Sequence, residues 1–227
     1  MKNKLVLTLA LLIALAGQAH ALTVLCNGDS NTGSSTGEPK WCEMLGAALE
    51  ADTINRGVGG STITDQVSYP WGIPSWAGYY IDFEVVGTDP FFVWTHGADT
   101  FIGQPTYTSL PAIDVAILAY GTNDINAYHF TVPKILQALK KYRRKLAKAG
   151  AQVYVATVPP IYELDGTKSP TLDPLIQRLN KRIRGNFPKT YIEFYEGFTW
   201  EDYNDRLHLN AQGHEKRALA ALEALSR

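Results

Sequence analysis

The sequence CNGDSN at residues 26–31 follows a short apolar run at 22–25 that is rich in strand-forming residues. Residues 32–37 are turn and helix-capping types, and a helical pattern begins near Pro39. This order of strand, turn, loop and helix places Ser30 at the carboxyl end of the first strand, the edge where open α/β sheets bind ligands. Gly28 permits a sharp turn there. Taken alone, residues 28–30 fit a plain strand-to-loop turn better than a catalytic site.

Apolar runs alternate with amphipathic helical patterns along the rest of the chain. The patterns predict strands at 22–25, 53–55, 113–119, 153–158 and 190–195, and helices at 39–49, 132–149, 172–184 and 210–226. The strands at 113–119 and 153–158 are almost continuously apolar, which is typical of buried parallel strands. We therefore expect a three-layer α/β/α sandwich around a parallel sheet.

The segment at about 64–112 breaks this pattern, because it combines eleven aromatic residues with several prolines and glycines. Residues 83–86 and 91–94 are possible short strands. A long irregular segment in a compact domain is often functional. Its aromatic side chains are open to two interpretations, a satellite core that holds the insertion together or a groove for sugar rings and acyl chains.

The length and net charge of the chain indicate the broad class of protein. The chain has 227 residues and a net charge of −1, which predicts one globular domain at 22–227 and argues against nucleic acid as the main partner. The basic run at 140–145 lies on an amphipathic helix, so we expect a solvated face there; a membrane-surface or anion site is the alternative.

The first 21 residues have the pattern of a signal peptide. Lys2 and Lys4 precede an apolar run at 5–16, and Ala-His-Ala at 19–21 is a typical cleavage site. The run is short for a membrane anchor. We expect cleavage after Ala21 and a mature protein exported to the periplasm or beyond, with no integral membrane segment.

Two cysteines, Cys26 and Cys42, remain in the mature chain. In an oxidising compartment they are consistent with a disulfide, and equally with two small buried residues. Because they lack nearby histidines at ligand spacing, we predict no metal site.

The informative polar residues all follow predicted strands or precede the last helix. They are Ser30, Gly60 in the glycine-rich loop 56–62, Asn123, and the pair Asp205 and His208. At one edge of a parallel sheet these residues can converge. A serine nucleophile, a histidine base and a carboxylate that orients the base suit acyl transfer. The backbone N–H groups of Ser30 and Gly60 and the amide of Asn123 are candidate oxyanion donors.

Each of these residues also has an ordinary structural explanation. Asp205 fits a cap of the turn before the last helix, and His208 fits a structural histidine with its hydrogen bonds satisfied. Asn123 fits a turn residue, and Asp124 fits a cap for the following segment. The glycine-rich loop lacks the Lys-Ser/Thr ending of a P-loop, so nucleotide binding is not expected. The four sites occurring together, in this order and at these strand ends, favour catalysis over the separate explanations.

These motifs resemble those of the SGNH hydrolases, the GDSL esterase/lipase family. The match covers GDS at 28–30, residues 55–62 with Gly60 as the aligned glycine, GTND at 121–124, and the Asp-x-x-His pattern of Asp205 and His208. Gly57 and Gly59 are fallback alignments for Gly60. The resemblance implies a flavodoxin-like sheet of about five parallel strands and hydrolysis of carboxylic esters through an acyl-enzyme, without a metal or cofactor.

The implied triad is Ser30, Asp205 and His208, and the implied oxyanion hole is Ser30, Gly60 and Asn123. Two departures bear on the substrate: the polar Asn31 beside the nucleophile and the long aromatic insertion. We expect short-chain or acetyl esters, small or on a carbohydrate. The alternatives are a lipase or arylesterase for longer chains, an O-acyltransferase, and a non-catalytic carbohydrate-binding module.

Overall fold

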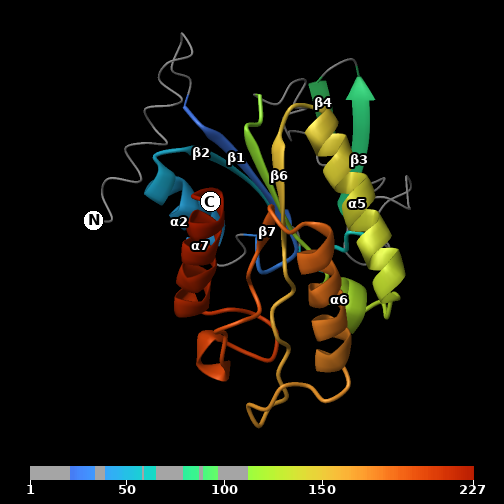
Figure 1. The fold of residues 1–227 in the computed structure, drawn as a ribbon, viewed down its shortest axis with the longest axis vertical. Coiled ribbons are helices and arrows are strands. Elements are labelled where there is room, and N and C mark those ends of the chain that lie inside the picture. The colour runs from blue at the N-terminus through green and yellow to red at the C-terminus, as the bar shows by residue number, and fades with distance from the viewer. Residues whose placement is uncertain (1–20, 34–38, 58, 65–78, 87–88, 97–111) are drawn as a thin grey trace.

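In a computed structural model of the protein, residues 21–33, 39–57, 59–64, 79–86, 89–96 and 112–227 are described. Five parallel strands form one sheet in the order β2-β1-β5-β6-β7 (Figure 1). They are β1 Thr23–Gly28, β2 Asp52–Gly57, β5 Val115–Ala119, β6 Gln152–Ala156 and β7 Tyr191–Ile192. Counted along the chain, this is the 2-1-3-4-5 order of flavodoxin-like folds. The predicted five-stranded α/β fold is therefore confirmed.

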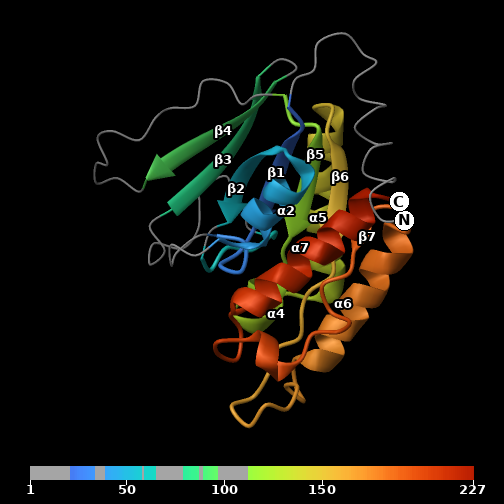
Figure 2. The same cartoon turned by 90° about the vertical axis from the view of Figure 1, so that its left-hand side faces the viewer.

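The helices cover both faces of the sheet. They are α2 Trp41–Leu49, α4 Thr122–Asn126, α5 Val132–Lys148, α6 Asp173–Asn186, α7 Ala211–Leu225 and the 3-10 helix η1 Trp200–Asp202. Helices α2 and α7 pack on one face of the sheet, and α5 and α6 pack on the other (Figure 1); Figure 2 views the face that α2 and α7 cover. This arrangement gives the three layers expected from the sequence.

Alternation along the strands explains the two cores. On β1, Val24 and Cys26 point towards α2 and α7, while Leu25 points towards α5 and α6. Successive strand residues face opposite sides of a sheet, so a strand covered on both faces is apolar at every position. The same reasoning accounts for the apolar run predicted at 113–119, of which residues 115–119 form β5.

The last strand is shorter than the predicted 190–195. The N–H of Phe194 donates to the Thr157 hydroxyl (2.7 Å) instead of to a strand carbonyl. The Glu193 carboxylate accepts the N–H of Tyr195 (2.9 Å) and of Glu196 (3.2 Å). Side chains thus replace the neighbouring strand as hydrogen-bond partners, and β7 ends at Ile192. The first helix also starts two residues later than predicted, at Trp41.

Between β2 and β5 in the sequence, β3 Tyr79–Val86 and β4 Asp89–His96 form a separate antiparallel hairpin. The possible strands at 83–86 and 91–94 fall within them. The aromatic side chains of this segment and residues 1–20 of the signal peptide predicted at 1–21 lie outside the described residues. Among the helices of the described part of the chain, none is long and apolar enough to span a membrane.

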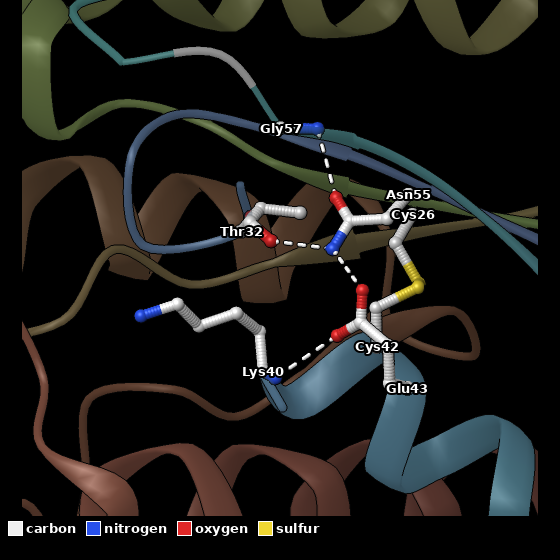
Figure 3. The surroundings of a disulfide bond; sticks show 7 residues. All are labelled: Cys26, Thr32, Lys40, Cys42, Glu43, Asn55 and Gly57. Carbon is white, nitrogen blue, oxygen red and sulfur yellow. Dashed lines mark hydrogen bonds between the residues drawn. A yellow bond between two sulfur atoms is a disulfide. The ribbon is translucent and has the colours of Figure 1, made fainter. Parts of the chain in front are cut away.

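A disulfide joins β1 to α2. Cys26 and Cys42 are bonded, with their Cα atoms 6.0 Å apart, and both are fully buried (Figure 3). The sequence alone did not decide whether this bond forms, because both cysteines could equally be small buried residues of the core. The bond fastens the strand that precedes Ser30 to the helix that follows it.

We expect reduction of this disulfide to lower the free energy of unfolding by about 3 kcal/mol, because it closes a loop of 16 residues in the unfolded chain. Urea titration with and without reductant measures the change. A Cys26→Ala/Cys42→Ala variant serves as the control, since its stability should not respond to reductant. Two free thiols in the denatured, unreduced protein would contradict the bond.

Candidate active site

A tight turn after β1 presents Ser30 at the carboxyl edge of the sheet. The Asp29 carbonyl accepts the N–H groups of Thr32 (2.9 Å) and Gly33 (3.0 Å), and the Asp29 carboxylate accepts the N–H of Asn31 (3.0 Å). Gly28 has no room for a side chain, because a Cβ there would overlap Thr32 and the Ala119 carbonyl. The turn thus depends on the residue types at 28–33 and places the Ser30 side chain beyond the strand.

His208 and Asp205 reach Ser30 from the loop before α7. His208 Nε2 lies 3.1 Å from Ser30 Oγ, and His208 Nδ1 lies 2.8 Å from Asp205 Oδ2. The other Asp205 oxygen accepts the N–H groups of Leu207 and His208, both at 2.7 Å. Burial raises the pKa of Asp205, but these hydrogen bonds from His208 and Leu207 outweigh it and hold the pKa below its ordinary value. The carboxylate therefore stays ionised beside the imidazole.

Asn31, the residue next to Ser30, fixes the loop that carries His208. Its amide donates to the Leu207 carbonyl (2.9 Å), and its oxygen accepts the Leu209 N–H (3.0 Å). The two bonds bracket His208 in sequence, and the Asn31 side chain is buried. The sequence marked Asn31 only as a departure from the family pattern. Its positioning role had no signal there, because the partners lie about 176 residues further on.

The glycine-rich loop and Asn123 lie at the same edge. A Cβ added at Gly59 would have Ser30 Cβ as its neighbour at 3.9 Å, so the loop runs beside the candidate nucleophile. Gly60 follows with φ 76°, a left-handed conformation that favours glycine. The Ser61 hydroxyl donates to the Gly28 carbonyl (3.1 Å), and the Asn123 amide donates to the Ser61 carbonyl (3.1 Å).

Asp124, for which the sequence offered only a role as a cap for the following segment, fastens this loop to α4. Its fully buried carboxylate accepts the N–H groups of Ile63 and Thr64, each at 3.1 Å, and the Thr64 hydroxyl at 2.6 Å. One side chain of the 121–124 motif thus holds the residues that directly follow the glycine-rich loop 56–62. The short helix α4, which the periodicity did not predict, directs it into the core.

A second polar strut, shown in Figure 3, supports the loop after Ser30. The Asn55 amide donates to the Thr32 carbonyl and to Glu43 on α2, both at 2.7 Å. Its oxygen accepts the N–H of Gly57 (3.0 Å). Gly57 in turn packs so closely on Gly33 that neither has room for a side chain. Asn55 therefore connects β2, α2 and the Ser30 turn.

Two buried ionisable groups, Asp29 in the turn and Arg217 on α7, interact with each other. Burial raises the pKa of the Asp29 carboxyl, and the Arg217 guanidinium of α7 opposes that shift. Arg217 is itself buried, and its guanidinium carbon lies 4.8 Å from the centre of the Phe194 ring. An unaccompanied buried charge is costly, so each ion favours the charged form of the other.

His214, one turn before Arg217, is also buried. Burial first, and then the charges of Arg217 and Lys40, lower its pKa to about 3. From pH 6.5 down to 3 the unfolded chain therefore binds a proton at this position that the folded protein does not. Stability from this group is present above pH 6.5 and is lost as the pH falls.

We expect His214 to remove about 2 kcal/mol from the free energy of unfolding between pH 7 and pH 5. Urea titrations at the two pH values, on wild type and His214→Gln, measure this contribution as the difference between their pH dependences. His129→Gln, at an exposed histidine, should retain the wild-type dependence. An unchanged dependence in His214→Gln would contradict the neutral buried imidazole.

No group of three or more His, Cys, Asp or Glu among the described residues is arranged to hold a metal ion. What the geometry offers at this edge is a serine hydroxyl, an imidazole and a carboxylate in one hydrogen-bonded row, with a glycine turn and a buried amide beside it.

A family model described as "GDSL-like Lipase/Acylhydrolase family" matches residues 26–216. The chain belongs to this family. Membership confirms the resemblance seen in the sequence motifs and the prediction of a carboxylic ester hydrolase. No curated protein matches the sequence of this GDSL hydrolase.

Solved structures share the fold of this GDSL hydrolase at low sequence identity. A member of the lipolytic protein G-D-S-L family from Veillonella parvula is 22% identical, with a TM-score of 0.61 over 91% of this chain and 100% of its own. A carbohydrate acetylesterase from Sinorhizobium meliloti is 19% identical (TM-score 0.58, 90% and 98% covered). The aryl esterase of M. smegmatis is 16% identical (TM-score 0.59, 90% and 98%).

Proposed function

We propose that the protein is an exported serine esterase that hydrolyses short-chain acyl esters through an acyl-enzyme. Ser30 attacks the ester carbonyl, and His208 takes the hydroxyl proton and then gives it to the leaving alcohol. Asp205 orients the imidazole. The N–H groups of Ser30 and Gly60 and the Asn123 amide stabilise the oxyanion. Water then releases the acid by the same steps.

The observation that carries the proposal is the continuous row from Asp205 through His208 to Ser30, with contacts of 2.8 and 3.1 Å. A general base must lie within hydrogen-bond reach of the proton that it removes. The His208 and Asp205 side chains are 47% and 55% exposed, so the row is open to a bulky substrate.

A short acyl group on a carbohydrate is the substrate that we favour. The structure from Sinorhizobium meliloti is named as a carbohydrate acetylesterase, and an open site is compatible with an acetyl group carried on a sugar chain. An aryl or longer-chain ester is the second candidate, which the aryl esterase among the structural neighbours favours.

A rate profile on p-nitrophenyl esters of about two to sixteen carbons, followed by acetylated xylan, tests this choice. We expect rates to fall steeply beyond about four carbons and acetate to be released from xylan. A maximum at long chains would instead assign a lipase. Transfer of acetyl to an added sugar in place of hydrolysis would assign an O-acyltransferase, and no turnover with intact sugar binding would assign a binding module.

Export is part of the same proposal, with residues 1–21 as the signal peptide and 22–227 as a single hydrolase domain. It is supported by the charged start, the apolar run and the Ala-x-Ala site. N-terminal sequencing of the protein recovered from outside the cytoplasm should begin at Leu22. Recovery of a chain that begins at Met1 would contradict it.

A further inference from the structure

The near-neutral total charge conceals a strongly basic face. Helices α5 and α6 together carry 11 of the 21 Lys and Arg residues of the chain and one of its 22 Asp and Glu residues. That one, Asp173, is buried and accepts hydrogen bonds from the Tyr195 hydroxyl (2.9 Å) and the Gln177 amide (2.6 Å). The rest of the chain consequently has an excess of acidic residues. Such segregation creates a field that attracts anions to one side of the molecule.

These two helices lie side by side on one face of the sheet (Figure 1). Side chains from both helices line a groove between them. Its main hollow has a volume of about 730 Å³. We call it the basic groove, and define it by Phe130, Leu136, Lys140, Leu175, Arg178 and Arg182. Lys140 also lines an adjoining hollow with Arg143, Arg144 and Lys189. Positive charge therefore continues along the groove.

The charges that line the groove are not neutralised by the part of the protein that the structure describes. No described carboxylate forms an ion pair with Lys140, Arg178 or Arg182. On the same helix, Arg184 pairs with Glu193 (2.8 Å) and Glu196 (3.4 Å). Arg184 is thus paired within the protein, whereas Lys140, Arg178 and Arg182 can bind an anion from outside.

We propose that the basic groove binds a linear anionic polysaccharide. Facing walls of positive charge suit a single chain lying between the helices, whereas a bilayer presents a plane that also approaches the more acidic remainder of the molecule. Two guanidinium forks match sugar carboxylates, which they can bind in a bidentate way. Leu136 and Leu175 add apolar side chains to the lining, against which the C–H faces of sugar rings can pack.

Single-stranded nucleic acid fits the groove less well. Such strands are held by stacking of bases on free aromatic rings. In the groove, the Phe130 ring is already stacked on Tyr128, with centroids 5.7 Å apart, and the Lys134 ammonium lies 3.8 Å from its centre. The proposed binding does not depend on ester hydrolysis; it would hold the enzyme on a polyanionic glycan.

Binding of polygalacturonate, measured by titration calorimetry at two salt concentrations, tests the proposal, with neutral dextran as the reference polymer. We expect Lys140→Gln/Arg182→Gln to weaken binding about tenfold or more at low salt and to reduce its salt dependence. The matched control, Lys141→Gln/Lys148→Gln, removes two charges from exposed positions on α5 that do not line the groove, and should weaken binding much less.

Urea titration of both double variants checks that they remain as stable as wild type, independently of any activity. If the two double variants lose the same amount of binding affinity, the binding depends on the overall positive charge and not on the groove, and the proposal is wrong. The proposal also fails if wild type does not prefer polygalacturonate to dextran. Tighter binding to phosphatidylglycerol vesicles or to a single-stranded oligonucleotide than to polygalacturonate would overturn it in favour of those ligands.

Discussion

Ser30→Ala is expected to lower kcat/KM on every ester substrate at least about 10⁴-fold, because alanine removes the proposed nucleophile, on which both half-reactions would depend. The fold should survive, since Ser30 is partly exposed and its hydroxyl contacts the exposed His208. We therefore expect the free energy of unfolding to stay within about 1 kcal/mol of wild type. Steady-state rates on p-nitrophenyl acetate and urea titration measure the two quantities.

Ser226→Ala provides a matched control for this prediction. The Ser226 hydroxyl donates to the Leu222 carbonyl at the end of α7, so its loss should leave the rate unchanged. His208→Gln should lower kcat/KM nearly as much as Ser30→Ala does. The double variant should be little less active than either single variant, because the two residues are proposed to act as one unit. Residual activity above about a tenth of wild type in Ser30→Ala would exclude Ser30 as the nucleophile.

The second large effect is expected at Asp124, on stability. Asp124→Ala removes an acceptor that serves three buried donors on Ile63 and Thr64 and leaves two backbone N–H groups without it. Hydrogen bonds to charged groups and unsatisfied buried donors each count for about 1–3 kcal/mol. We expect the free energy of unfolding to fall by about 4 kcal/mol, and activity to fall as well because the loop at 59–64 loses its anchor.

Two milder variants grade this prediction. Thr64→Val removes only the hydroxyl bond and should cost about 1 kcal/mol, while Asp124→Asn keeps one oxygen acceptor and should fall in between. Urea titrations of the three variants give the series. If Asp124→Ala stays within about 1 kcal/mol of wild type, the carboxylate does not anchor the loop.

The elements of the fold could be predicted because their signals are local. The run at 115–119 is apolar at every position, which is typical of a strand covered on both faces. The sequence could also point to Ser30, Asn123 and His208 as candidate site residues. Each follows a strand or precedes a helix, and a parallel sheet brings such positions to one edge. The geometry of Asp205 and His208 follows from their spacing of three residues.

The polar struts could not be predicted, because their partners are distant in sequence and their residue types are common in turns. Asn31 and Asp124 suit an ordinary loop and Asn55 suits the end of a strand, and only the folded chain brings them to their partners 12 to 178 residues away. The end of β7 depends on Thr157 and Glu193 in the same way. Net charge was also uninformative, since it averages a basic face with an acidic remainder.

The most direct test of the account is labelling with a fluorophosphonate, followed by intact-mass and peptide mass spectrometry. A serine activated by a neighbouring imidazole forms one stable adduct, so we predict a single label per chain, located on Ser30 and absent from Ser30→Ala and His208→Gln. An unlabelled wild-type protein, or an adduct on another residue, would contradict the proposed triad.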